Sequence, residues 1–274
     1  MKAMILEQTA SLDEVAQPLR LAELPVPVPA AAELLVQVSV CGVCHTELDE
    51  IEGRLTPSRL PIVLGHEVIG HVHDRGEAAR RFSIGERVGI GWIHHSDGRT
   101  DENLSPEFAA TGCDVNGGYA QYMTVPQDYA ARIPENLSDA EAAQLMCAGA
   151  IGYRALGLTL IRDGQPLGLM GFGGSAHLVL QLAKYLYPGC PVFVFDRNKS
   201  VQQFAIRLGA DWAGGVDAQP PERPKAIIDT TPAWLPVLAA MEALEPGGRL
   251  VINAIRKEAG ESDEEFGFNS NYLE

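Results

Sequence analysis

The chain has 274 residues, of which 46% are hydrophobic and 21% are charged. That length accommodates two domains of ordinary size, and the composition is typical of a folded globular protein rather than a disordered one. The formal net charge of -15 disfavours nucleic acid as a partner, because phosphate backbones attract clusters of Lys and Arg and the sequence contains no such cluster.

The five cysteines form an odd-numbered set that is scattered along the chain. This pattern disfavours a disulfide framework and favours reduced thiols. The first residues lead into a strand-like segment without a long apolar signal region, and no stretch approaches the roughly 18 apolar residues that a membrane span requires. We therefore expect a soluble, cytoplasmic protein with no membrane partner.

Strand patterns dominate the first half of the chain. Residues 34–40 alternate small polar and β-branched side chains, and three prolines between residues 25 and 29 impose an extended approach to that strand. Further short strands are expected at 60–64 and 68–72, and a turn followed by a short strand at 85–90 and again at 117–122. Short strands separated by Gly and Pro predict a small, partly open β-barrel for residues 1–150.

The pattern changes near residue 139. Ser138, followed three positions later by Glu141, has the form of a capping box that begins a helix. Beyond it, strands are expected at 167–172, 192–195, 226–228 and 250–253, and helices at 175–187 and 200–208. This alternation predicts an α/β domain with a parallel, doubly wound sheet over residues 151–256. Residues 257–274 form a charged run that is expected to be an acidic, solvated tail.

A glycine-rich motif follows the first strand of the second half. It has the form G-x-G-x-x-G/A and consists of Gly171, Gly173, Gly174 and Ala176. Such a strand-to-helix turn lets a pyrophosphate approach the backbone at the helix N-terminus. Asp196 ends the next strand, where a carboxylate can hold both ribose hydroxyls of NAD. Asp196 would repel a phosphorylated ribose, which favours NAD over NADP, although the neighbouring Arg197 weakens that preference.

The first half contains candidate metal ligands. Cys41 and Cys44 form a C-x-x-C pair, which would be half of a structural zinc site, but no second pair follows. Taken singly, Cys44, His66 and Cys147 are explained as ordinary structural residues. Together they offer two sulfurs and one imidazole, a donor set that suits a zinc ion with one free coordination position.

Four stretches of the sequence resemble the zinc-dependent medium-chain alcohol dehydrogenases in order and spacing. They are residues 41–48 (CGVCHTEL), 64–70 (LGHEVIG), 116–120 (NGGYA) and 145–149 (LMCAG). The resemblance covers about residues 1–256 and implies a GroES-like catalytic domain and a Rossmann domain, with the active site between them. It implies hydride transfer between NAD and a small alcohol, or the reverse reduction of an aldehyde or ketone, with zinc as Lewis acid.

The resemblance also assigns roles to individual residues. The zinc ligands would be Cys44, His66 and Cys147. Glu67 corresponds to a carboxylate close to the metal, and Thr46 to the hydroxyl that binds the substrate oxygen and starts a proton relay. His45 corresponds to a basic residue near the cofactor pyrophosphate, and Thr230 to a further cofactor contact.

Several positions depart from the family pattern. Glu47 stands where the family usually has Asp, and Asp49 stands where many relatives carry a relay histidine. A role for Asp49 in proton exit is therefore open, because Asp ionises well below neutral pH in water. Between Trp92 and Tyr119, where the family has four cysteines for a structural zinc, only Cys113 remains. We expect one catalytic zinc and no structural zinc.

The end of the chain also departs from the family. Relatives continue beyond the strand at 250–253 with a segment that supplies a sixth sheet strand and part of a dimer contact. In its place stands the acidic tail, so the last part of the sheet is expected to be missing and a homo-oligomer to be weakened. Two alternatives follow: a truncated, catalytically impaired NAD-binding relative, and a zinc-free quinone-type reductase, which the complete ligand set disfavours.

Overall fold

The computed structural model describes residues 1–99, 101–254 and 257. The chain divides into two compact units, Met1–Cys147 and the described residues from Ala148 onward. The boundary predicted after residue 150 lies within α3 (Ala148–Leu158), which belongs wholly to the second unit. Apart from Lys257, the predicted acidic tail lies outside the described residues. Among the helices described, none is both long and apolar enough to cross a membrane.

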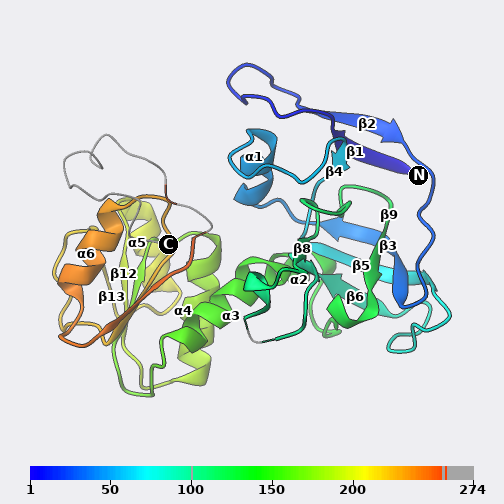
Figure 1. Ribbon diagram of the computed structural model, residues 1–274. Coiled ribbons are helices and arrows are strands. Elements are labelled where there is room, and N and C mark those ends of the chain that lie inside the picture. The colour runs from blue at the N-terminus through cyan, green and yellow to red at the C-terminus, as the bar shows by residue number, and fades with distance from the viewer. Residues whose placement is uncertain (100, 255–256, 258–274) are drawn as a thin grey trace. The chain divides into compact units, whose positions relative to one another are not determined.

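Antiparallel sheets form the first unit (Figure 1). The largest sheet has the order β10-β6-β5-β3-β9 and consists of β3 (Glu33–Cys41), β5 (Val68–Arg75), β6 (Arg87–Ile90), β9 (Tyr122–Pro126) and β10 (Ala130–Arg132). Two smaller sheets, β2-β1-β4 and β7-β8, contain β1 (Lys2–Leu6), β2 (Leu19–Glu23), β4 (Ile62–Val63), β7 (Ile93–His95) and β8 (Ala109–Ala110). The predicted partly open barrel is confirmed as a GroES-like antiparallel half-barrel.

The core of this half-barrel follows from the alternation of side chains along its strands. Leu34 and Val36 of β3 point to the same face and pack with Val68 and Val72 of β5. Phe82, in the turn before β6, is also buried in this cluster. The turn and short strand predicted at 117–122 are present, but β9 begins only at Tyr122. Residues 117–119 instead form a loop whose amides donate to carbonyls of residues 63–65.

Two α-helices lie in the first unit, α1 (His45–Ile51) and α2 (Asp139–Ala143). The capping box predicted at the start of α2 is confirmed, because the Ser138 hydroxyl accepts from the Glu141 amide and the Glu141 carboxylate accepts from the Ser138 amide. Short 3-10 turns cover Glu102–Leu104, Gln127–Tyr129 and Gln144–Met146. The sequence did not predict α1, although it carries several of the site residues.

A five-stranded parallel sheet organises the second unit, with the order β13-β12-β11-β14-β15 (Figure 1). Its strands are β11 (Leu167–Met170), β12 (Val192–Phe195), β13 (Trp212–Gly214), β14 (Ala226–Asp229) and β15 (Arg249–Ile252). The remaining helices are α4 (Gly174–Leu186), α5 (Lys199–Arg207) and α6 (Leu235–Ala243). The predicted Rossmann-type, doubly wound sheet is confirmed. The structure also contains β13, α3 and α6, which the sequence did not predict.

Both faces of this sheet are covered, which explains its continuously buried strands. Leu167 and Leu169 of β11 face α3, α4 and α5, whereas Met170 faces the cluster that contains α6. Strands that are buried on both faces are apolar at every position rather than at alternate positions, as VFVF in β12 illustrates. No sixth strand joins the sheet within residues 148–254.

Candidate metal centre and dinucleotide site

Four side chains from distant parts of the first unit meet at one point. Cys44 precedes α1, His66 and Glu67 precede β5, and Cys147 follows the 3-10 turn at Gln144–Met146. One potential ligand atom from each residue lies within 4.8 Å of those from the other three. Over the described part of the chain, no second group of three or more such side chains meets in this way. The structure thus brings the three ligands predicted from the sequence into one group, and Glu67 is its fourth member.

The spacing of the two sulfurs fits a single zinc ion. Cys44 Sγ and Cys147 Sγ are 3.9 Å apart. Two thiolates at zinc–sulfur distances of about 2.3 Å in a tetrahedral arrangement are separated by about 3.8 Å. Two sulfurs, one imidazole and a nearby carboxylate form a donor set that zinc accepts readily. The residues present therefore fit a catalytic-type zinc site.

Gly65 allows the His66–Glu67 segment to turn into the site. Its φ angle is +98°, in the left-handed region that residues other than glycine rarely adopt. A Cβ at this position would lie 2.7 Å from the Tyr119 ring and 2.8 Å from Cys41 Sγ. The glycine is required both for the backbone angle and for the space, and Cys41 is a neighbour of the site rather than a member of the group.

Glu47 fixes the orientation of the His66 ring. Glu47 Oε1 lies 2.6 Å from His66 Nδ1, and both side chains are buried. Glu47 Oε2 accepts a hydrogen bond of 2.7 Å from the Cys44 amide. With Nδ1 directed at Glu47, Nε2 is the ring atom left to bind a metal. The longer carboxylate, which departs from the family pattern, therefore still orients a candidate ligand.

The ionisable side chains of the metal group shift one another's pKa values. Hydrogen bonding from Cys147 lowers the pKa of Cys44 to about 3, and His66 and Thr46 act in the same direction. The same contact, together with burial, raises the pKa of Cys147. Burial alone would lower the pKa of His66, but contacts with Cys44 and Glu47 raise it to about 10. One thiolate and one protonated imidazole are therefore expected before a cation displaces the remaining protons.

Two further side chains contact the group. The Thr46 hydroxyl oxygen is buried and lies 3.5 Å from Cys44 Sγ. The Trp92 ring packs edge-on against His66, with a centroid distance of 5.0 Å. Burial, followed by the charge of Cys44, raises the pKa of Glu67 to about 6. The Thr46 hydroxyl is thus next to the candidate metal position.

Asp49 and His45 lie outside the metal group. Asp49 is buried, and its Oδ1 accepts a hydrogen bond of 2.6 Å from Arg54 Nε. Arg54 also pairs with Glu52. His45, the first residue of α1, is exposed. Asp49 Oδ1 is therefore paired with a guanidinium.

The segment between Trp92 and Tyr119 is held by hydrogen bonds. The Ser96 hydroxyl donates to Glu102 at 2.5 Å and lies 2.9 Å from the Tyr129 hydroxyl. The Tyr129 hydroxyl also donates to the Ser96 carbonyl and accepts from its amide. Cys113, the only cysteine of this segment, is buried. This network fastens the segment by side chains that need no metal.

The glycine motif forms the expected turn between β11 and α4. Gly171 has a φ angle of +78°, and a Cβ there would lie 2.8 Å from Thr231 Cγ2. Gly173 precedes the helix and Gly174 begins it, and a Cβ on either would meet no atom within 4 Å. Ala176 is fully buried against the sheet. The turn therefore presents an open backbone surface at a helix N-terminus, which fits a pyrophosphate.

Asp196 lies beside this turn. Its Oδ2 accepts from the Phe172 amide at 3.0 Å, and its Oδ1 accepts from the Asn198 amide at 2.8 Å. Arg197 is exposed, and the Thr230 hydroxyl donates to the Met170 carbonyl. Gly171, Asp196 and Thr230 follow three adjacent strands at their carboxyl ends, where open α/β sheets bind nucleotides.

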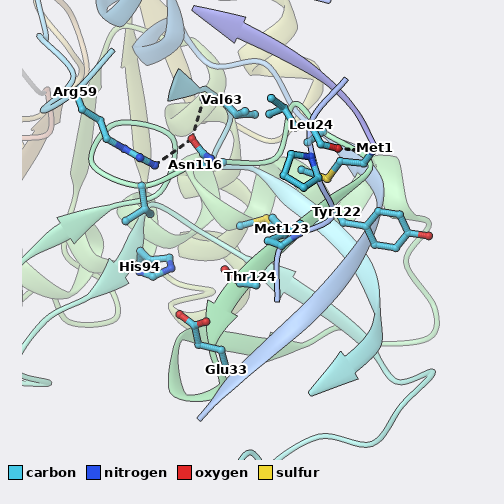
Figure 2. A pocket seen from close by; sticks show the side chains of 15 residues that line it. Met1, Leu24, Glu33, Arg59, Val63, His94, Asn116, Tyr122, Met123 and Thr124 are labelled. Carbon is cyan, nitrogen blue, oxygen red and sulfur yellow. Dashed lines mark hydrogen bonds between the residues drawn. The ribbon is translucent and has the colours of Figure 1, made fainter. Parts of the chain in front are cut away.

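A separate cavity of about 440 Å³ lies in the first unit (Figure 2). Figure 2 shows Arg59 directed at Asn116, whose side-chain oxygen accepts from Arg59 and from the Val63 amide. His94 also lines the cavity, and burial lowers its pKa. None of the four members of the metal group lines this cavity. We place the chemistry at the metal group because donor atoms converge there.

Known proteins resemble this chain in sequence. Residues 30–135 match the family model of the alcohol dehydrogenase GroES-like domain. A protein of Mycobacterium tuberculosis named "Probable alcohol dehydrogenase AdhA" is 44% identical over 241 residues, which is 84% of this chain and 69% of that protein. The chain belongs to the zinc-containing medium-chain alcohol dehydrogenase family. This family comprises NAD(P)-dependent oxidoreductases that act on CH–OH groups. The chain spans 62% of other alcohol dehydrogenases that it matches.

Solved structures share the fold. A protein of Sinorhizobium meliloti 1021, described as a zinc-binding dehydrogenase bound to NADP, has a TM-score of 0.82 and 26% identity, covering 97% of this chain and 81% of its own. A protein of E. coli CFT073, described as a short chain alcohol dehydrogenase complexed with NADH, has a TM-score of 0.80 and 25% identity, covering 97% of this chain and 80% of its own.

Sequence reasoning missed Glu50, one of the three buried acids of α1. The Glu47 carboxylate was expected to be able to orient a ligand, and Asp49 was considered for proton exit, but Glu50 was not considered as part of the site. The spacing of three residues between Glu47 and Glu50 would have placed both on one face of a helix, had α1 been predicted. The helix has only seven residues and a cysteine at the N-cap position, so Glu47 at N3, whose carboxylate accepts from the Cys44 amide, is the one conventional member of its capping box.

Proposed function

We propose that this chain is a zinc-dependent alcohol dehydrogenase that transfers hydride between a small alcohol and NAD. The observation that carries the proposal is the convergence of Cys44, His66, Glu67 and Cys147 in a family whose members are oxidoreductases. Cys44, His66 and Cys147 would bind one zinc ion. Glu67 would remain as a nearby carboxylate, since three protein ligands leave a position open in catalytic zinc sites.

A bound zinc ion would act as a Lewis acid and ease removal of a hydroxyl proton from the substrate. Thr46 lies where it would receive that proton while releasing its own hydroxyl hydrogen to a further acceptor, because its buried Oγ1 lies 3.5 Å from Cys44 Sγ, next to the candidate metal position. Glu47 would keep the His66 ring fixed during this step. Trp92 would exclude water from one side of the ring.

The proton's exit from Thr46 is expected to be indirect. Asp49 lies one helical turn beyond Thr46, but Arg54 already donates to its carboxylate. An ion-paired carboxylate is a weak proton acceptor at neutral pH. We propose that Asp49 holds Arg54 against the last turn of α1, and that its replacement affects the pH dependence of turnover less than the replacement of Thr46 does.

The nicotinamide of a bound dinucleotide would accept or return the hydride. Gly171, Gly173 and Gly174 would hold its pyrophosphate, with Ala176 packed beneath and Thr230 and His45 as additional contacts. Asp196 would bind the ribose hydroxyls, which supports NAD over NADP, while Arg197 is the side chain available to a phosphorylated ribose. We expect Asp196→Ala to weaken NADH binding and to reduce the preference for NADH over NADPH.

The proposal is tested by measuring NADH formation with a panel of primary and secondary alcohols before and after zinc is removed with a chelator. We expect turnover that disappears on chelation and returns when zinc is added. A chain that binds zinc and NADH but turns over none of the alcohols would instead support the impaired NAD-binding relative. Turnover that persists in chelator would support a zinc-free reductase.

A further inference from the structure

Lys257 is a buried cation at the carboxyl edge of the parallel sheet. The sequence pattern placed it at the start of a solvated tail, but its side chain is only 6% exposed. Its ammonium group pairs with the carboxylate of Asp229, which is fully buried. It also donates a hydrogen bond of 2.7 Å to the carbonyl of Thr231. Lysines are almost never buried unless they are paired, so this contact is a specific feature of the fold.

Asp229 ends β14 and holds the residues that follow it, here called the 229–231 segment. Its Oδ1 accepts hydrogen bonds from the Thr231 amide at 3.1 Å and from the Thr231 hydroxyl at 2.7 Å. Its Oδ2 faces Lys257, which is the one cation paired with it over the described residues. Loss of this cation would leave a buried charge uncompensated, which is costly, so the carboxylate would reorient and loosen its hold on Thr231.

The 229–231 segment lies against the glycine turn. A Cβ on Gly171 would lie 2.8 Å from Thr231 Cγ2 and 3.2 Å from Thr230 Oγ1. The amide and the hydroxyl of Thr230 both donate to the carbonyl of Met170, the residue before that glycine. A displacement of the segment would therefore change the space beside Gly171, where the pyrophosphate is expected.

The segment also lies on the side of the sheet that would receive the nicotinamide half of the cofactor. In doubly wound sheets, a dinucleotide crosses the carboxyl ends of the strands where the strand order reverses. Here that point lies between β11 and β14, since β12 and β13 continue the sheet on one side and β15 on the other. Asp196 follows β12, on the side of the adenosine ribose, so the side of β14 is left for the nicotinamide nucleotide.

We infer that Lys257 is a positioning residue for the nicotinamide half of the dinucleotide: by compensating the charge of Asp229, it keeps the 229–231 segment in place beside Gly171. The inference rests on the proposed function, because it requires that the glycine turn bind NAD. The lysine is buried, so it acts through Asp229 rather than by touching the cofactor. Two consequences distinguish this role from a general contribution to folding. The effect is confined to the nicotinamide half, and removal of both charges reverses it.

The test compares Lys257→Met with the double variant Asp229→Asn/Lys257→Met in the full chain. Binding of NADH, and of AMP, which carries only the adenosine half, is measured by titration calorimetry, and stability by urea unfolding. We expect Lys257→Met to weaken NADH binding about 10-fold and to change AMP binding far less. The double variant should bind NADH within about 3-fold of the unchanged chain, because the asparagine oxygen can still accept from Thr231 and no charge is left buried.

Lys184→Met is the matched control, because Lys184 also pairs with an aspartate, Asp211, but at the amino ends of the strands, where Asp211 accepts from the Val192 amide. It should leave the binding of NADH and of AMP unchanged, and a loss of NADH binding equal to that in Lys257→Met would overturn the inference.

Unchanged NADH affinity in Lys257→Met would also overturn it, and Lys257→Gln takes the place of that variant if it does not fold. Equal losses for NADH and AMP would contradict the assignment to the nicotinamide half. A double variant as weak as Lys257→Met would contradict the role through Asp229. If the unchanged chain bound no NADH, the proposed function itself would fail, which is a different result.

Discussion

The two units of this chain build their sites in different ways. In the first unit, the metal group is assembled from side chains at residues 44, 66, 67 and 147, and each depends on neighbours such as Glu47. In the second unit, the candidate dinucleotide site is mainly backbone, a glycine turn between β11 and α4, with Asp196 as the chief side chain.

This difference predicts different responses to mutation. A site made of converging side chains fails when one donor is lost, and also when an outer partner such as Glu47 moves. A site made of backbone tolerates most side-chain changes but fails where a new Cβ would disturb the turn. The following predictions, from the largest effect to the smallest, test this contrast.

Cys44→Ser is expected to have the largest effect. Loss of one thiolate from the metal group should weaken zinc binding by more than about 100-fold, because a ligand matters more than an outer partner. Activity should fall with it, whereas NADH binding, measured by titration calorimetry, should remain close to that of the unchanged chain. Cys190→Ser, a buried cysteine of the second unit, is the control. Joint loss of NADH and zinc binding would contradict the separation of the two sites.

Glu47→Ala should weaken zinc binding about 10- to 100-fold, because it frees the His66 ring and removes the acceptor for the Cys44 amide. Chelator competition measures the change, and the cobalt spectrum should shift as well. Asp49→Asn, on the same helix, should change zinc affinity far less, since Asp49 Oδ1 faces Arg54. Equal losses in the two variants would show that α1 matters only as a folded helix.

Glu50 should make the stability of the zinc-free chain depend on pH. With a folded-state pKa of about 8 against an ordinary 4.5, the folded chain keeps a proton that the unfolded chain has released. Unfolding free energy should therefore fall as pH rises from about 5 towards 8, by up to about 1.4 kcal/mol per pH unit. Urea unfolding in chelator measures it. Glu50→Gln should remove this component, and an unchanged slope in that variant would contradict the assignment.

Gly171→Ala should cost about 1 kcal/mol or more, because φ is +78° and the new Cβ would meet Thr231. NADH binding should weaken as the turn distorts, while zinc affinity should not change. Gly157→Ala is the matched control, since Gly157 lies within α3 and a Cβ there meets no atom within 4 Å. That variant should be as stable as the unchanged chain or slightly more so. Unaltered NADH binding in Gly171→Ala would count against the glycine turn as the dinucleotide site.

The sequence was most informative where a signal was local. Strand and helix alternation predicted the parallel sheet, and the Ser138–Glu141 capping box was confirmed, because each depends on residues within a few positions. α6 was missed because apolar residues lie on most of its faces, which removes the helical period. A turn was expected at the start of 117–122, but the extent of the loop was not, since its hydrogen bonds to residues 63–65 are made only in the folded unit.

For the site, too, contacts between residues far apart in the sequence could not be predicted from local signals. The convergence of Cys44, His66 and Cys147 was inferred from the family resemblance, because side chains 103 positions apart carry no local signal of contact. The contacts of Glu47 with His66 and of Asp49 with Arg54 depend on the register of α1, a short helix that has a cysteine at its N-cap position. The burial of Glu50 is likewise a property of the packed unit.

The central claim is that the four converging side chains form one catalytic zinc site and that the segment between Trp92 and Tyr119 needs no metal. The most direct measurement is the zinc content per chain by elemental analysis after saturation and removal of free metal. The account predicts one zinc per chain, and none in Cys44→Ser. Two zinc ions per chain, no zinc, or one that survives in Cys44→Ser would contradict it.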